Sequence, residues 1–211
     1  MGRIGCRVAY GMGALIRWCY RVETWCLQAY WREQLQGSRE RLSIGEGFRA
    51  YAPERITIGD DVSIGRNVTL RALTYYPWSD PAQTFDPRME IGSGGFISHG
   101  AHLSCVERIT LGPRVMIADH VYVADHDHDY RAADLPIKQQ TLVKKGPLSI
   151  GADSWIGANA CLTGGIAIGK HCVIGAQAVV TSDIPDFSVA VGAPARVIKQ
   201  FDSDRGVWVA V

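Results

Sequence analysis

Aliphatic residues recur at every sixth position through most of the chain, and this spacing is the strongest constraint on its fold. Five sets of three positions carry only Ile, Leu or Val: Ile58, Ile64 and Leu70; Ile91, Ile97 and Leu103; Leu111, Ile117 and Val123; Ile150, Ile156 and Leu162; Ile168, Ile174 and Val180. A period of six fits neither a helix, with about 3.6 residues per turn, nor an alternating strand, with about two. Short fixed periods of this kind are typical of solenoids.

Each set of three predicts one triangular coil of about 18 residues, in which every extended segment buries one aliphatic side chain. Gly helps the chain to turn the corners where the backbone needs room or a positive φ. Successive coils stack as parallel strands about 4.8 Å apart, so that equivalent side chains form one core. The sequence therefore predicts a mainly β protein, a parallel β-helix over residues 42–200. A helical segment over residues 1–41 precedes it, and a tail over residues 201–211 follows it.

Two segments interrupt the repeat inside the predicted solenoid. Residues 73–89 read LTYYPWSDPAQTFDPRM, and residues 125–147 begin within VADHDHDYR. Interruptions of a solenoid map to surface loops, and loops on a rigid scaffold commonly carry function. We therefore expect functional residues in both loops.

Charge and cysteine usage narrow the class of protein. The formal net charge is +1, which argues against a broad nucleic-acid-binding surface. None of the six cysteines forms a C-x-x-C pair and no secretory leader precedes them, which predicts reduced thiols in the cytosol. No apolar run is long enough to span a membrane. We expect a cytoplasmic protein that does not bind nucleic acid.

The repeats, and above all the block PLSIGADSWIGANACLTGGIAIGKHCVIGAQAVVTSDIPDFSVAVGAPARVIK, resemble the hexapeptide-repeat acyltransferases. Within them the chain is most similar to the sugar O-acetyltransferases of the galactoside, maltose and polysaccharide-modifying type. The resemblance implies a left-handed β-helix, a homotrimer, and direct acetyl transfer from acetyl-CoA, without a metal, to a hydroxyl of a sugar or glycan precursor. The left hand comes from the resemblance alone, because parallel crossovers are generally right-handed.

The stretch VADHDHDYR contains the candidate catalytic base. Histidine suits the deprotonation of a hydroxyl near neutral pH, because its unperturbed pKa is about 6.5. In the resembling family the catalytic histidine directly follows a completed coil, and here that position is His126. His128 is the competing histidine, and we expect it to contact the acceptor or to face solvent. Asp125, Asp127 and Asp129 are all candidates for orienting the imidazole.

The resemblance also implies a donor groove between subunits and an acceptor site next to it. The matching cofactor-binding positions are Trp155, Gly157, Ala158, Gly175, Ala176, Thr181, Ser182, Arg196 and Lys199. The family commonly has Thr-Lys where this chain has Thr181-Ser182, so one basic phosphate contact is missing. Each Gly serves equally well as a coil corner. The matching acceptor positions are Ser98, His99, His128, Trp78 and Trp155, with Ser98 replacing a frequent Asn.

Other functions fit parts of this pattern. The γ-class carbonic anhydrases share the solenoid and bind zinc through three histidines, for which His99, His120 and His126 are the candidates. Their ligand spacing is not reproduced here. An N-acetyltransferase acting on a nucleotide-linked amino sugar, and a non-catalytic scaffold, are further alternatives.

The N-terminal segment has a character of its own. Five arginines fall on one face of a predicted helix, with aromatic residues between them: Arg3, Arg7, Arg17, Arg21 and Arg32. A basic amphipathic helix rich in aromatic residues is typical of a membrane-surface element. This pattern predicts peripheral contact with the inner face of a membrane; the alternative is a helix that packs on the solenoid or between subunits.

Overall fold

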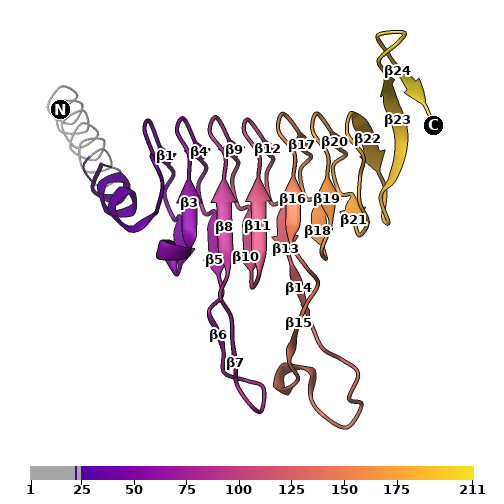
Figure 1. Cartoon of the computed structure of the whole chain (residues 1–211). Coiled ribbons are helices and arrows are strands. Elements are labelled where there is room, and N and C mark those ends of the chain that lie inside the picture. Colours follow the sequence, from indigo (N-terminus) through magenta and orange to yellow (C-terminus); the bar gives the residue numbers. More distant parts are fainter. Residues whose placement is uncertain (1–21, 23–24) are drawn as a thin grey trace, which may run out of the picture.

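The computed structural model describes residue 22 and residues 25–211, which form a solenoid with a helix at one end and a hairpin at the other (Figure 1). Short parallel strands stack into three faces. Face A consists of β3 (Ile56–Ile58), β8 (Arg88–Ile91), β11 (Arg108–Leu111), β16 (Leu148–Ile150) and β19 (Ala167–Ile168). Face C consists of β2 (Arg49–Tyr51), β5 (Thr69–Ala72), β10 (His102–Cys105), β13 (Tyr122–Ala124), β18 (Cys161–Thr163) and β21 (Val179–Val180).

Face B is the longest of the three faces. It consists of β1 (Ser43–Ile44), β4 (Ser63–Ile64), β9 (Phe96–Ile97), β12 (Met116–Ile117), β17 (Trp155–Ile156), β20 (Val173–Ile174), β22 (Ser188–Val191), β23 (Arg196–Asp202) and β24 (Val207–Ala210). Within each central coil the chain passes from face A to face B and then to face C. This order gives the triangular coil that the period of six predicts.

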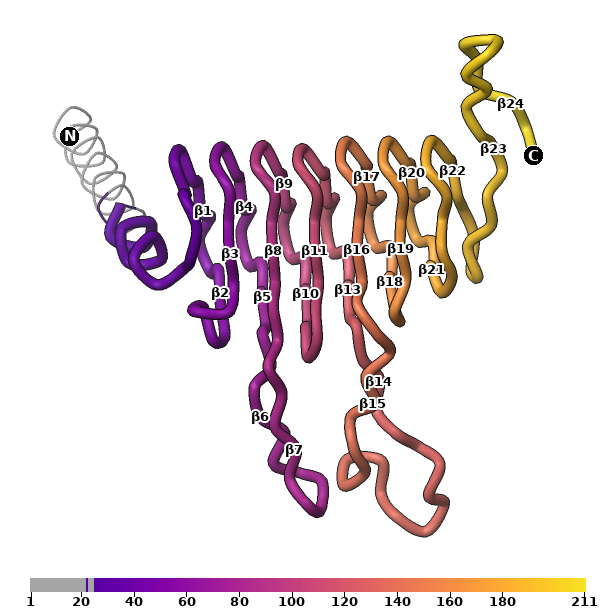
Figure 2. Tube along the Cα trace, in the orientation of Figure 1, coloured from indigo at the N-terminus to yellow at the C-terminus, as the bar shows by residue number. Residues whose placement is uncertain are grey.

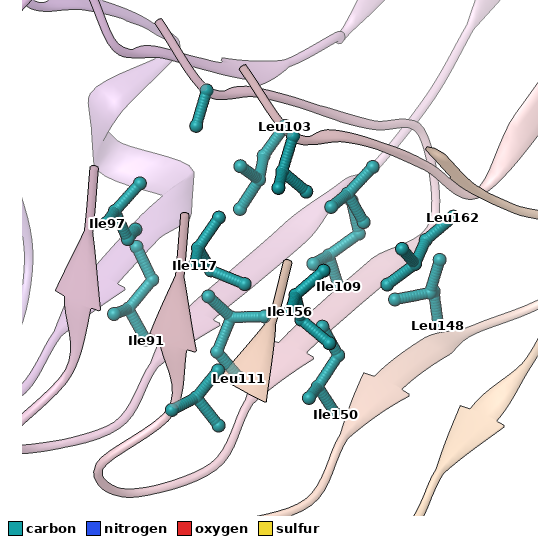
Figure 3. Packing of buried hydrophobic residues seen from close by; sticks show 14 of the residues in the cluster. Ile91, Ile97, Leu103, Ile109, Leu111, Ile117, Leu148, Ile150, Ile156 and Leu162 are labelled. Atoms are coloured by element: carbon teal, nitrogen blue, oxygen red, sulfur yellow. The ribbon is translucent and has the colours of Figure 1, made fainter. Parts of the chain in front are cut away.

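The aliphatic residues of the five sets form three continuous ladders inside the coils. The ladder of face A joins Ile58, Ile91, Leu111, Ile150 and Ile168. Faces B and C place Ile64 beside Ile97 and Leu70 beside Leu103 in the same way. All fifteen predicted side chains are at most 3% exposed, and Figure 3 shows how those of the central coils meet in one core. The predicted parallel β-helix is confirmed.

The glycines that follow the core isoleucines serve the first of the two roles expected for them, room for the backbone, and not the second, a positive φ. A Cβ atom added to Gly157 would lie 2.6 Å from the backbone nitrogen of Ala176 in the next coil, and its φ is not positive. The left-handed corner positions are instead occupied mostly by other residues, for example Asn67 (φ 56°) and His120 (φ 56°). Asn is among the residues that tolerate this conformation best. Glycine here permits close approach of successive coils.

Two excursions leave the solenoid, both at the corner between faces C and A. The first spans residues 73–87 and contains β6 (Tyr75–Tyr76) and β7 (Gln83–Thr84). The second spans residues 125–147 and contains β14 (His126–His128), β15 (Leu142–Lys144) and the short helix η2 (Ile137–Gln139). One coil separates their points of departure, and both project in the same direction (Figure 2).

The ends of the solenoid differ from its middle. Residues 25–34 are helical, and Trp31 packs edge-on against Phe48, with ring centroids 5.1 Å apart. Leu35 is fully buried in the core of the first coils, and Arg32 donates a hydrogen bond to the carbonyl of Leu42 at 2.8 Å. The short helix η1 (Pro53–Arg55) joins β2 on face C of the first coil to β3 on face A of the second.

Part of the N-terminal prediction falls outside the described residues, namely Arg3, Arg7, Arg17 and Arg21. No helix among the residues the structure describes is long and apolar enough to cross a membrane. At the other end, β23 and β24 form an antiparallel hairpin on β22, so the predicted tail belongs to face B.

Candidate active site

The first residues of the second excursion bring a carboxylate and an imidazole together. Asp125 follows the last residue of β13 and is fully buried, and His126 begins β14 with 10% of its side chain exposed. The Nδ1 atom of His126 lies 3.0 Å from the Oδ1 atom of Asp125. Of the three candidate aspartates, Asp125 is therefore the one that contacts this ring.

The carboxylate of Asp125 is held by the tight corner of the preceding coil. The backbone N–H groups of Val106, Glu107 and Arg108 donate to its two oxygens at 2.8, 2.8 and 2.9 Å. Burial alone raises the pKa of a carboxyl group. Here the hydrogen bonds outweigh burial and hold the pKa of Asp125 below its ordinary value. The hydrogen bond from His126 lowers it most.

This arrangement determines the protonation of the imidazole. An ionised carboxylate only accepts hydrogen bonds, so Nδ1 of His126 carries the proton that lies between the two groups. In the neutral ring Nε2 then has a free lone pair, and it can accept a proton. The pair has the chemistry of an oriented general base.

The neighbouring polar residues of the excursion have other partners. Asp127 lies 3.4 Å from the ammonium group of Lys145, and Asp129 forms an ion pair with Arg131 at 2.6 Å. The ring of His128 is exposed, with its centroid 5.8 Å from that of Tyr76 in the first excursion. Only His126 of the two histidines has a buried carboxylate behind it.

The outer surface of face C lies beside His126. His102 and Tyr122 are neighbours in register, with ring centroids 5.7 Å apart. Burial lowers the pKa of His102, and the nearby side chains of Arg71 and His126 lower it further. Burial also raises the pKa of Tyr122. Both rings are therefore neutral near pH 7. The hexapeptide pattern does not predict this surface, because outward positions carry no periodic signal.

A hollow of about 150 Å³ on face B is lined by other residues predicted for the site. Its lining includes Ser98, Trp155 and Ala158, together with Phe96, Met116, Ile117, Ala118 and Asp119. The hydroxyl of Ser98 donates to Asp119. Phe96, Met116 and Trp155 are adjacent in register, and each is between 42% and 49% exposed. The hollow is thus an apolar groove with a polar rim.

The hollow and His126 lie on opposite sides of the coil. His126 leaves the corner between faces C and A, and in a triangular coil this corner is opposite face B. The predicted acceptor and donor residues Ser98, Trp155 and Ala158 therefore do not meet His126 within one chain. A single site that uses both sets needs a second copy of the chain.

Comparison with known proteins agrees with this architecture. The family described as Bacterial transferase hexapeptide (six repeats) matches residues 147–182. A probable acetyltransferase of Mycobacterium tuberculosis is 36% identical over 185 residues, which cover 83% of this chain and 57% of that protein. Residues 147–182 of this chain thus match the hexapeptide repeat of bacterial transferases, and most of the chain is similar in sequence to this acetyltransferase.

Two further proteins are similar to this chain, one in sequence and one in fold. One, from Escherichia coli and named as a lipopolysaccharide biosynthesis O-acetyl transferase, is 32% identical over 114 residues, covering 51% of this chain and 58% of that protein. The other is an N-acyltransferase from Bacillus cereus, solved with dTDP and 3-hydroxybutyryl-CoA. Its fold matches with a TM-score of 0.68 and 20% identity, covering 82% of this chain and 87% of that chain. The chain spans little more than half the length of the two sequence relatives.

The remaining predicted donor positions lie in three places. Gly157, Ala158, Gly175 and Ala176 occupy the corner between faces B and C, directly after β17 and β20. Thr181 and Ser182 are exposed at the corner between faces C and A, after β21. Arg196 and Lys199 lie on β23. The close approach of coils at Gly157 requires glycine whether or not a donor binds there.

Two predicted acceptor residues already have partners in this chain. The ammonium group of Lys138 lies 3.7 Å from the centroid of the Trp78 ring, which is 55% exposed. The Nδ1 atom of His99 accepts a hydrogen bond from the backbone N–H of Arg66 at 2.9 Å. Among the described residues, no three His, Cys, Asp or Glu side chains are grouped so that they could hold a metal ion.

Proposed function

We propose that this chain transfers an acetyl group from acetyl-CoA to a hydroxyl of a sugar or glycan precursor, with His126 as the general base. The observation that carries the proposal is the buried Asp125 carboxylate 3.0 Å from Nδ1 of His126. A base of this kind contributes roughly 10²–10⁴-fold to a rate. A solvated polar loop would not hold a carboxylate on three backbone N–H groups.

The proposed reaction is a direct transfer. Nε2 of His126 removes the proton of the acceptor hydroxyl while its oxygen attacks the thioester carbonyl carbon. The tetrahedral oxyanion is stabilised by a backbone N–H, the C–S bond then breaks, and the imidazolium returns the proton to the leaving thiolate. Cys105 lies 3.4 Å from Asp125, but burial, above all, raises the pKa of its thiol. A buried, protonated thiol is a poor nucleophile, so Cys105 is unsuited to form an acyl-enzyme, and the proposed transfer is direct.

We further propose that the complete site forms between copies in a homotrimer, with Arg196 and Lys199 near the phosphates of the donor. This is supported by the position of the face B hollow opposite His126, and by the apolar side chains that line it. Closed cyclic symmetry satisfies an interface between two different surfaces. Light scattering at concentrations where the enzyme is active tests the assembly, and a monomeric mass would end both the trimer and the shared site.

The nature of the acceptor rests on two kinds of support. The Escherichia coli relative is named for an O-acetyl transfer in lipopolysaccharide biosynthesis. His102 and Tyr122 offer neutral ring faces beside His126, and such faces stack on the C–H surfaces of sugars. Ser98, His99, His128 and Trp78 are further candidates for hydrogen bonds and stacking around the acceptor.

N-Acyl transfer to a nucleotide-linked amino sugar is the second candidate function. The likeness in fold to the Bacillus cereus N-acyltransferase favours it. The same base would deprotonate an ammonium group before attack, so the geometry of Asp125 and His126 serves either acceptor.

The experiment is an acceptor screen with acetyl-CoA that follows the release of free thiol. Paired acceptors that differ only by a hydroxyl or an amine at one carbon separate O-transfer from N-transfer. The His126→Ala variant is the control for thiol release without the base. If the wild type releases no thiol above this control with any sugar, the proposed function is wrong.

A further inference from the structure

The two excursions, which we together call the arm (residues 73–87 and 125–147), share a small hydrophobic core separate from that of the solenoid. Tyr76, Val106 and Leu142 are buried in this cluster, at 7%, 0% and 5% exposure, and Leu73 and Phe85 pack against it. Val106 belongs to the coil between the two excursions. The cluster therefore joins three segments that are far apart in the sequence.

Polar contacts tie the two excursions together next to this cluster. The side-chain amide of Gln83 accepts a hydrogen bond from the backbone N–H of Leu142 at 2.6 Å and donates one to its carbonyl at 3.1 Å. The hydroxyl of Tyr76 donates to the carbonyl of Lys138 at 2.6 Å. Because the Gln83 side chain bonds to both the N–H and the carbonyl of Leu142, it fixes the position and orientation of β15 relative to the first excursion.

The strand that Gln83 holds is paired with the strand that carries the candidate base. β15 pairs with β14 in antiparallel register, with Leu142 opposite His128 and Lys144 opposite His126. The next residue, Lys145, donates its backbone N–H to the carbonyl of Asp125 at 2.9 Å. Val106 links the arm cluster to the same pair: its side chain packs in the cluster, and its backbone N–H donates a hydrogen bond to the Asp125 carboxylate.

We propose that Gln83 is a positioning residue for the Asp125–His126 pair, and that the first excursion exists to hold the second in its productive geometry. The proposal rests on the proposed function. Without Gln83, β15 loses two main-chain partners and β14 loses its fixed neighbour. A displacement of the reacting group by about 1 Å can lower a rate by about 10²-fold.

The test compares two substitutions of Gln83 with a matched control in the same arm. Gln83→Leu keeps the approximate size and removes both hydrogen bonds, whereas Gln83→Glu keeps an acceptor for the N–H of Leu142. Gln140→Leu removes a comparable glutamine, whose amide binds the backbone of Ala132 and Leu135 within the second excursion alone. All three are measured for kcat, for the KM of acetyl-CoA, for urea unfolding and for amide hydrogen exchange of β14.

We expect Gln83→Leu to lower kcat by roughly 10–100-fold, with the KM of acetyl-CoA and the unfolding midpoint close to those of the wild type. Exchange of the amides of residues 126–128 becomes faster by at least about 10-fold. Gln83→Glu falls between wild type and Gln83→Leu in both measurements. Gln140→Leu keeps kcat and β14 exchange within about 3-fold of the wild type.

Two results would overturn the proposal: β14 exchange that does not change in Gln83→Leu, or equal losses in Gln83→Leu and Gln140→Leu. The hydrogen exchange also separates this proposal from the proposed function. If the wild type transfers no acetyl group to any acceptor, the proposed function fails, and exchange at β14 still decides whether Gln83 holds the strand.

Discussion

The coils and the arm of this molecule are built in opposite ways. In the coils, each residue meets its counterpart in the next turn, so that Ile97 pairs with Ile117 and Ile117 with Ile156. In the arm, the strands are antiparallel, and each contact occurs once, as between Gln83 and Leu142. A repeated local rule thus builds the rigid scaffold, and unique long-range contacts build the part that carries the candidate base.

The comparison assigns catalysis to the arm, and removal of the candidate base tests this assignment with the largest expected effect. We expect His126→Ala to lower kcat by roughly 10²–10⁴-fold, because general-base catalysis contributes this much, and to leave acetyl-CoA affinity nearly unchanged. Steady-state kinetics and donor titration measure both. His128→Ala is the comparison variant: its ring has no buried carboxylate, so we expect kcat to be kept, and loss of an acceptor contact would raise only the KM of the acceptor. An active His126→Ala and an inactive His128→Ala would move the base by two residues.

A pair of alanine substitutions sharpens the contrast between the two cores. Ile156→Ala, in the fully buried ladder of face B, should lower the free energy of unfolding by about 2–5 kcal/mol. Leu142→Ala, in the small cluster of the arm, should lower it less and should reduce kcat more. Urea unfolding and kinetics on both variants decide this. A Leu142→Ala variant that loses as much stability as Ile156→Ala and keeps its kcat would show one cooperative core.

The buried carboxylate predicts a dependence of stability on pH. The folded pKa of Asp125 lies below its ordinary value of 3.8, so its contribution to stability is complete above about pH 4 and is lost as pH falls through the folded pKa. The gap in unfolding free energy between wild type and Asp125→Asn should therefore be largest near neutral pH and shrink below about pH 4. Urea unfolding at several pH values measures the gap.

The control for this titration is Asp134→Asn, at an exposed position of the second excursion. It should show no comparable gap at any pH. A gap between wild type and Asp125→Asn that stays constant down to about pH 2 would mean that the Asp125 carboxylate does not titrate with folding.

The smallest expected effect concerns the N-terminal segment, for which we propose peripheral contact of a cytoplasmic protein with the inner face of a membrane. Each basic residue near an anionic surface contributes about 1 kcal/mol, and salt screens this attraction. A chain that lacks residues 1–24 keeps Trp31 and Leu35 on the solenoid, so it should fold and transfer acetyl groups normally. Sedimentation with anionic vesicles at low and high salt compares it with the full chain. Equal pelleting of the two would exclude the membrane role.

The sequence predicts the coils well because every coil repeats the same requirement. Ile58, Ile91 and Leu111 can be aligned from spacing alone, and the structure places them in one ladder. The departure points of both excursions follow from the same count, because the repeat stops there. Asp125 and His126 are found at such a stop.

The contacts of the arm cannot be predicted in this way. Tyr76 and Lys138, or Gln83 and Leu142, are separated by 62 and 59 positions, and no local pattern links them. The choice of Asp125 over Asp127 and Asp129 also depends on the corner at Val106 in the preceding coil, which lies 19 positions earlier. The repeat pattern predicts glycine either for close approach of the backbone or for a positive φ. The structure shows that crowding between coils selects it at positions such as Gly157, whereas most left-handed corners carry other residues.

The two ends of the solenoid determine whether separate copies stay apart or add to one another as polymers. Stacked parallel coils present an open edge to which another coil, from any copy, can add, and unprotected edges of this kind lead to polymers. At one end Trp31 and Leu35 close the first coil, and at the other β23 reverses direction against β22, with an irregular register after Val189. An antiparallel strand offers no parallel template for a further coil. The end structures, Trp31 and Leu35 on one side and β23 on the other, therefore prevent the addition of further coils. Loss of either one would favour growth into fibres.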